Sequence, residues 1–252
     1  GRLVEANKEA LAALVTREIG KPYAEALGEV QEVVDTCDFF LGEGRRLYGQ
    51  TVPSEMPDKQ LFTFRMPVGT AMIITAGNFP AAVPSWYIVP ALVTGNTIVW
   101  KPAEQTAAIA QAMAEIFYAG GVPRDVLKVV IADGPATYDG LEAALQKRLV
   151  QKIGFTGSTE VGRRLSELAG RHLQSPCLEL GGKNPNIVFA DADLPAAIDN
   201  ALTAVFLHSG QVCSAGARLV VEESIHDDFI ARLKARMQTL SPTRSRGEIR
   251  SD

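Results

Sequence analysis

Apolar residues recur at intervals of three and four near the start of the chain, which is the spacing of one helix face. The residues that share it are Leu3, Ala6, Ala10, Leu11 and Leu14. The sequence Gly20–Lys21–Pro22 ends this run, and a second periodic run extends from Tyr23 to about Phe40. We therefore expect two helices before the first strand.

The pattern becomes polar and alternating from Gly49 to Pro67, with turn residues at Pro57–Asp58. Alternation on both sides of a turn is typical of a β-hairpin. The segment predicts a hairpin that stands off the main body, which makes it a candidate interaction surface.

Short apolar runs then alternate with helical stretches. The expected strands are Gly69–Thr75, Thr97–Trp100, Leu127–Ile131, Lys152–Phe155 and Asn186–Phe189. This order predicts an α/β fold with a parallel sheet wrapped by helices, whose ligands bind beyond the carboxyl ends of the strands. Candidate chemistry is therefore sought just after each strand, in residues 76–80, 101–104, 133–135 and 156–162.

Composition narrows the function classes. The 252 residues carry a formal net charge of −4, which gives no long-range attraction for nucleic acid or anionic lipid. The three cysteines (Cys37, Cys177 and Cys213) are too scattered for a disulfide framework and lack zinc-ligand spacing. The chain shows no secretory signal, and its longest apolar segment is too short for a membrane span. We expect a soluble, cytoplasmic protein that acts on small molecules and holds no metal.

Two loops are candidates for nucleotide binding. Residues 157–162 (Gly-Ser-Thr-Glu-Val-Gly) follow a strand and open a helix, where backbone N–H groups can face a phosphate; for this loop taken alone, a tight turn with Ser158 or Thr159 capping the helix is the commoner interpretation. The spacing differs from the usual dinucleotide fingerprint. Lys101 and Glu104 follow another strand, where the carboxylate can accept from ribose hydroxyls, although an exposed ion pair also fits.

Two residues are candidates for covalent and acid–base chemistry. Cys213 lies among small residues, which suits a nucleophile, whereas a lone cysteine is more often a small buried hydrophobe. Glu179 lies between two leucines, and we expect apolar surroundings that suit a general base; a paired structural Glu is equally consistent.

Five blocks of sequence, taken together, resemble the signature blocks of the aldehyde dehydrogenase superfamily in order. They are Asn78-Phe-Pro, residues 95–104 (GNTIVWKPAE), residues 155–162 (FTGSTEVG), residues 178–185 (LELGGKNP) and residues 210–213 (GQVC). The resemblance implies a Rossmann-like cofactor domain at residues 1–48 and 68–180 and an oligomerisation hairpin at 49–67. It also implies an incomplete catalytic α/β domain at 181–252, and a homodimer or homotetramer for the longer protein.

The resemblance further implies oxidation of an aldehyde to a carboxylic acid with NAD, NADP being possible. Cys213 would be the nucleophile, Glu179 the base for thioester hydrolysis and Asn78 an oxyanion donor. The implied cofactor-binding residues are Thr75, Lys101, Glu104, Gly134, Phe155, Gly157, Ser158, Gly162 and Leu180. Two positions depart from the family pattern. Gly77 stands where many members have Trp, which should widen the substrate passage, and Tyr87 stands where many have Lys, which puts a proton-relay role in doubt.

Two other functions stay open. A CoA-acylating enzyme would pass the acyl group to CoA, but it needs no base at Glu179. A truncated, inactive nucleotide-binding protein is favoured by the missing later family block (Glu-Ile-Phe-Gly-Pro) and the abrupt end at Asp252. In that case we expect unpartnered apolar faces at Ala201–Leu207 and Leu219–Val221, and an unstructured tail from Ser241 to Asp252.

Overall fold

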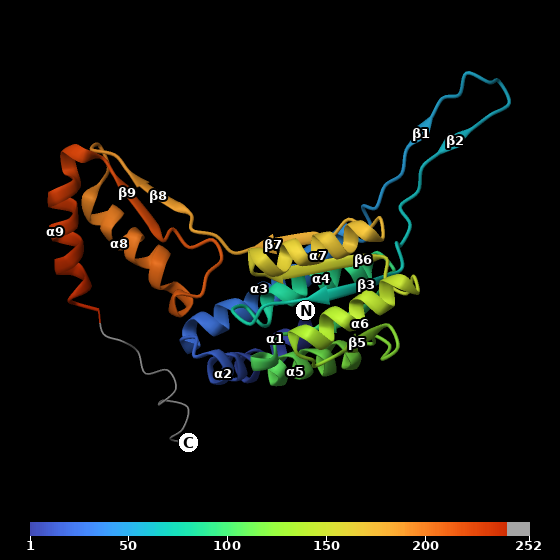
Figure 1. Cartoon of the computed structure of the whole chain (residues 1–252), viewed down its shortest axis with the longest axis horizontal. Coiled ribbons are helices and arrows are strands. Elements are labelled where there is room, and N and C mark those ends of the chain that lie inside the picture. Colours follow the sequence, from blue (N-terminus) through green and yellow to red (C-terminus); the bar gives the residue numbers. More distant parts are fainter. Residues whose placement is uncertain (241–252) are drawn as a thin grey trace.

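The computed structural model describes residues 1–240, which form an α/β fold whose main sheet is parallel (Figure 1). The tail from Ser241 to Asp252 lies outside the described residues. The sheet has five strands in the order β5-β4-β3-β6-β7. Their bounds are β3 (Thr70–Ile74), β4 (Thr97–Lys101), β5 (Leu127–Val129), β6 (Lys152–Gly157) and β7 (Cys177–Leu180). The expected parallel α/β sheet is confirmed, and β7 is a strand that the sequence pattern missed.

The core of this domain has two layers, one on each face of the sheet. Ala71 and Ile73 of β3 face the helices α1 (Arg2–Ala6) to α5, whereas Met72 and Ile74 face α6 and α7. The later helices are α4 (Ala82–Val93), η1 (Glu104–Thr106), α5 (Ala107–Ala119), α6 (Gly134–Gln146) and α7 (Thr159–Arg171). Because successive residues of a strand point to opposite faces, a nearly continuous apolar strand is buried on both sides.

The first periodic run is two helices rather than one. Residues Arg2–Ala6 form α1 and Lys8–Ile19 form α2, with a break at Asn7, whose backbone leaves the helical region (φ −113°, ψ 14°). The Asn7 side chain donates to Leu3 O at 2.8 Å. The Asn7 side chain thus occupies a carbonyl oxygen that a backbone N–H would bind in a continuous helix, which explains why the expected single helix is interrupted. The second run forms α3 (Tyr23–Glu43), three residues longer than expected.

The predicted hairpin is present and projects from the main body (Figure 1). Strands β1 (Thr51–Val52) and β2 (Leu61–Phe62) pair in antiparallel register, Thr51 opposite Phe62. Several of its apolar side chains are exposed, including Phe62, Phe64 and Met66.

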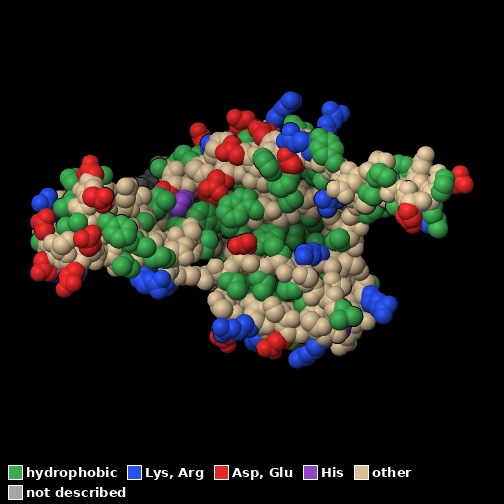
Figure 2. Space-filling view, turned by 90° about the horizontal axis from the view of Figure 1, so that it is seen from above, with side chains coloured by type: hydrophobic (Ala, Val, Ile, Leu, Met, Phe, Trp, Pro, Cys, Tyr) green, Lys and Arg blue, Asp and Glu red, His purple; other side chains and the backbone are tan. Residues whose placement is uncertain are grey.

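Residues after 184 form a smaller unit at the opposite end of the molecule from the hairpin (Figure 2). Strands β8 (Pro185–Val188) and β9 (Arg218–Val221) pair in parallel, with α8 (Leu194–Phe206), η2 (Leu207–Gly210), η3 (Glu223–Ile225) and α9 (His226–Met237). The expectation that the apolar faces of α8 and β9 lack partners is wrong in part. Ala201 and Leu202 pack with Leu219 and Val221 around the buried ring of Phe229, because α9 covers a face that sequence pattern alone left open.

None of the helices in the described part of the chain combines the length and apolar character that crossing a bilayer requires.

Candidate functional site

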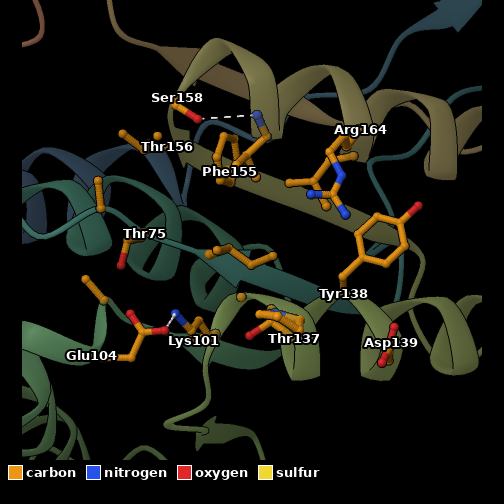
Figure 3. Close-up of a pocket in the computed structure, with 18 residues that line it drawn as sticks. Thr75, Lys101, Glu104, Thr137, Tyr138, Asp139, Phe155, Thr156, Ser158 and Arg164 are labelled. Carbon is orange, nitrogen blue, oxygen red and sulfur yellow. Dashed lines mark hydrogen bonds and ion pairs between the residues drawn. The ribbon is translucent and has the colours of Figure 1, made fainter.

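A cavity of about 580 Å³ opens at the carboxyl ends of β3, β4 and β6 (Figure 3). Among the residues that line it are seven of the expected cofactor-binding residues: Thr75, Lys101, Glu104, Gly134, Phe155, Gly157 and Ser158. The structure therefore brings together residues that lie up to 83 positions apart between Thr75 and Ser158.

Two helices begin at this cavity. The side chain of Asp133 caps α6 by accepting from Ala136 N (2.8 Å), and that of Ser158 caps α7 by accepting from Val161 N (3.3 Å). A helix N-terminus carries partial positive charge and free N–H groups, so two of them on one cavity favour an anionic ligand. Gly157 is required sterically, because a Cβ there would lie 2.5 Å from Cζ of Phe155.

Lys101 and Glu104 form an ion pair beside these helix ends. Lys101 Nζ lies 3.2 Å from Glu104 Oε1, and the lysine side chain is buried whereas that of the glutamate is 43% exposed. The exposed carboxylate retains acceptor capacity toward the cavity (Figure 3).

Four polar lining residues were not expected from the sequence: Thr137, Tyr138 and Asp139 of α6 and Arg164 of α7. The Arg164 guanidinium lies 5.1 Å from the ring of Tyr138, so the two helices meet across the cavity (Figure 3). No motif marks these residues, and only the packing of α6 beside α7 brings them to the site.

The other two expected cofactor-binding residues, Gly162 and Leu180, do not line this cavity. Gly162 is buried in α7, and a Cβ there would meet Leu180 Cδ2 at 2.7 Å. Gly162 therefore allows close packing of α7 on β7, while Leu180 lines a second cavity.

The second cavity, of about 780 Å³, lies beside the first, and the two share Ala76, Thr156, Gly157 and Ser158 in their walls. Asn78, Glu179 and Cys213 all line it, although they come from three separate segments: the loop after β3, strand β7 and the loop after η2. The three expected catalytic side chains thus face one space.

The loops of Asn78 and Cys213 are tied together directly. Asn78 Nδ2 donates to the backbone oxygen of Gln211 at 2.9 Å. The backbone of His208 and Ser209 is left-handed (φ 53° and 57°), a conformation that costs energy for residues with a Cβ and that must be held by surrounding contacts. Cys213 is exposed and lines the cavity.

Glu179 is not in the apolar surroundings that its flanking leucines indicated. It is exposed and lines the second cavity, whereas the neighbouring Leu178 and Leu180 are partly buried and pack against the core cluster that contains residues of α6 and α7. The cause is the alternation of side chains along a strand, which separates a residue from its immediate neighbours in sequence.

The two positions that depart from the family pattern lie at this site. Gly77 lines the second cavity. Tyr87 reaches from α4 to β6, where its hydroxyl lies 2.9 Å from Thr156 Oγ1 and 3.3 Å from Phe155 O. Burial raises the pKa of Tyr87, so its hydroxyl stays protonated at neutral pH.

In the described residues, no group of three or more His, Cys, Asp or Glu side chains is arranged to hold a metal ion.

Comparisons with known proteins identify relatives of this chain. A betaine aldehyde dehydrogenase from Bacillus subtilis is 40% identical over 238 residues, which are 94% of this chain and 48% of that protein. The NADP(+) succinate-semialdehyde dehydrogenase of Escherichia coli is 41% identical over 238 residues, 94% of this chain and 49% of that enzyme.

A solved structure of betaine aldehyde dehydrogenase from Staphylococcus aureus, in complex with NAD+, superposes with a TM-score of 0.90 at 34% identity, covering 94% of this chain and 47% of the other. The chain thus spans about half the length of the relatives it matches. The family model described as "Aldehyde dehydrogenase family" matches residues 1–248, and the chain belongs to that family.

Proposed function

We propose that this chain carries the cofactor site and the reacting groups of an aldehyde dehydrogenase, which oxidises an aldehyde to a carboxylic acid with NAD(P). The observation that carries the proposal is the shared wall between the two cavities: Ala76, Thr156, Gly157 and Ser158 separate a site suited to a dinucleotide from one that contains a thiol, an amide and a carboxylate.

The first cavity fits the adenosine and pyrophosphate parts of a dinucleotide. The N-termini of α6 and α7 favour the phosphates, and Glu104 with Lys101 offers an acceptor and a donor to ribose hydroxyls. Gly157 and Ser158 would lie along the pyrophosphate, while Thr75, Gly134 and Phe155 shape the remaining wall. When bound, the nicotinamide supplies the hydride acceptor that the oxidation needs.

The second cavity supplies the reacting side chains. In this mechanism the Cys213 thiolate attacks the aldehyde carbon, and the oxyanion is bound by the Cys213 backbone N–H and by the Asn78 amide. The Asn78 amide has two N–H groups, so its bond to Gln211 O leaves one for the oxyanion. After oxidation the acyl group is a thioester on Cys213. Glu179 then takes a proton from the water that attacks this thioester, which releases the acid and the thiol.

We also propose the division of the chain that the family resemblance implied: a cofactor domain at residues 1–48 and 68–180, a hairpin at 49–67 and part of a catalytic domain from 181. The exposed apolar side chains of the hairpin support a role in forming a homodimer or homotetramer.

The assignment of Cys213 is tested by comparing two exposed thiols of the same chain. Cys213→Ala should abolish aldehyde-dependent NADH formation and leave NAD binding, measured by calorimetry, within about twofold of the unsubstituted chain. Cys177→Ser, the matched control, should change neither quantity, because Cys177 does not line either cavity. Substantial turnover by Cys213→Ala would refute the assignment.

A further inference from the structure

A buried ion pair behind the site contacts the loop that carries Asn78. The side chains of Lys21 and Glu29 pair with each other, and neither is exposed to solvent. Glu29 Oε1 also accepts from the backbone N–H groups of Ala81 (2.8 Å) and Ala82 (3.2 Å). Helix α4 has no capping side chain of its own. Glu29 therefore supplies the cap from α3 and fixes where α4, and the Asn78 loop before it, begins.

The same lysine connects to the loop that carries Cys213. Lys21 Nζ lies 3.6 Å from the centroid of the Phe79 ring, a cation–π contact. The Phe79 ring also contacts the imidazole of His208, with ring centroids 4.6 Å apart. Phe79 directly follows Asn78, and His208 lies five residues before Cys213, so this stack joins the two loops on the side away from the cavity.

Hydrogen bonds from the N-terminal helices complete the arrangement. Glu25 Oε2 accepts from the backbone N–H of His208 at 2.6 Å, and Gly20 O accepts from Ser209 Oγ at 3.0 Å. The Gln211 side chain donates to Ile19 O at 3.3 Å, while its backbone oxygen accepts from Asn78. These contacts hold the left-handed backbone of residues 208 and 209 against α2 and α3.

We propose that Lys21 and Glu29 are positioning residues that set the placement of the Asn78 loop relative to the Cys213 loop. The proposal deepens, and rests on, the proposed aldehyde oxidation, since it gives the N-terminal helices a role in building the oxyanion site. Neither side chain touches either cavity, so they act through Ala81, Ala82, Phe79 and His208.

Because Lys21 and Glu29 carry opposite charges, single and double substitutions can distinguish a positioning role from a general effect on stability. A buried carboxylate without its cation carries a large desolvation penalty, whereas removal of both charges leaves a neutral site that can still pack. Lys21→Met alone should therefore loosen both loops. Lys21→Met combined with Glu29→Gln should restore them in large part, because the substituted side-chain amide keeps an oxygen that can accept from Ala81 N and Ala82 N.

Hydrogen exchange followed by mass spectrometry tests this directly. Lys21→Met should speed exchange in residues 78–85 and 205–214 together, while α6 exchanges as before; the double variant should return both segments toward the original rates. Lys8→Met is the matched control, because Lys8 is a partly buried lysine at the start of α2 that donates to the Gln31 side chain of α3. Unchanged exchange in 205–214, or equal loosening by the control, would overturn the proposal.

A second variant covers the case in which Lys21→Met unfolds the whole chain. Phe79→Leu keeps the ion pair but removes the ring between Lys21 and His208. Phe79→Leu should speed hydrogen exchange in residues 205–214 and leave the exchange of α6 unchanged. If residues 205–214 exchange as slowly as in the unsubstituted chain, the proposal is overturned.

A kinetic readout separates positioning from structure. Lys21→Met should lower kcat for aldehyde oxidation roughly tenfold or more, with NAD binding changed less than about twofold, and the double variant should recover kcat. Equal losses of kcat and NAD affinity would contradict the positioning role. If the unsubstituted chain neither binds NAD nor oxidises aldehydes, the proposed function fails, whereas the exchange experiment still decides whether the pair holds the two loops.

Discussion

The ring of Tyr87 packs directly against the backbone of Gly154. A Cβ on residue 154 would lie 2.8 Å from Cδ1 of the tyrosine. Gly154 lies within β6, paired with Ile73 of β3 on one side and Cys177 of β7 on the other. This close approach sets the Tyr87 hydroxyl beside Thr156, in the wall between the two cavities.

Gly154→Ala should therefore destabilise the chain by about 1–3 kcal/mol, because the added methyl group overpacks a rigid contact between α4 and β6. Gly140→Ala is the matched control: nothing lies within 4 Å of its added Cβ in α6, and it should stabilise by up to about 1 kcal/mol through helix propensity. Urea unfolding with unchanged m-values measures both. A neutral Gly154→Ala would show that Tyr87 can move away freely.

Glu179→Gln should separate the two halves of the proposed reaction. Acylation and oxidation precede the step that needs the base, so the first turnover should give a normal burst of NADH while the steady-state rate falls by about a hundredfold. Stopped-flow absorbance measures both phases. Glu167→Gln removes an exposed carboxylate on α7 that lines neither cavity and should leave both phases unchanged. Equal loss of burst and steady state in Glu179→Gln would place this residue in an earlier step.

Glu104 should favour NAD over NADP, because its carboxylate would accept from the ribose hydroxyls but repel a 2′-phosphate. Lys101 at 3.2 Å offsets part of that repulsion. Glu104→Gln should therefore shift the ratio of the two dissociation constants toward NADP by about fivefold. Calorimetric titrations with each cofactor measure the ratio. Glu142→Gln is the control, because it removes a carboxylate of α6 that does not line the cavity, and it should leave the ratio unchanged. Tighter binding of NADP than NAD by the unsubstituted chain would contradict the expectation.

His208 should make the chain sensitive to acid. Burial, and secondarily the charge of Lys21, lower the pKa of His208 from 6.5 to about 4. As the pH falls, the unfolded chain binds this proton first, so the contribution of His208 to stability is complete above pH 6.5 and is lost as the pH falls from 6.5 to about 4. The carboxylate of Glu25, 3.9 Å from Nδ1, faces the same ring.

His208→Asn removes the titrating group while keeping a residue that tolerates the left-handed backbone. The free energy of unfolding of this variant should fall less than that of the unsubstituted chain between about pH 7 and about pH 5. Chemical unfolding at the two pH values measures the difference. Parallel losses in both proteins would show that His208 does not contribute to the acid sensitivity.

The sequence by itself determined the family and most of the order of strands and helices, and it named the candidate reacting groups. Runs of apolar residues predicted the parallel sheet, and the blocks around Asn78, Lys101, Gly157, Glu179 and Cys213 indicated the family, which the comparison with its model confirms. This was possible because strand and helix periodicities are local, and because three of the blocks lie at the carboxyl ends of β3, β4 and β6, where parallel sheets place their ligands.

Only the tertiary structure determined on which face of a strand or helix each side chain lies and which distant residues hold it in place. The exposure of Glu179 follows from the pleat of β7 beside β6, and the break at Asn7 from a side-chain contact. The links from Lys21 to Phe79 and from Glu25 to His208 join segments 58 and 183 residues apart. No local pattern encodes such contacts, because the burial that pairs these groups exists only when α3 packs against α4 and the loop after α8 closes over both.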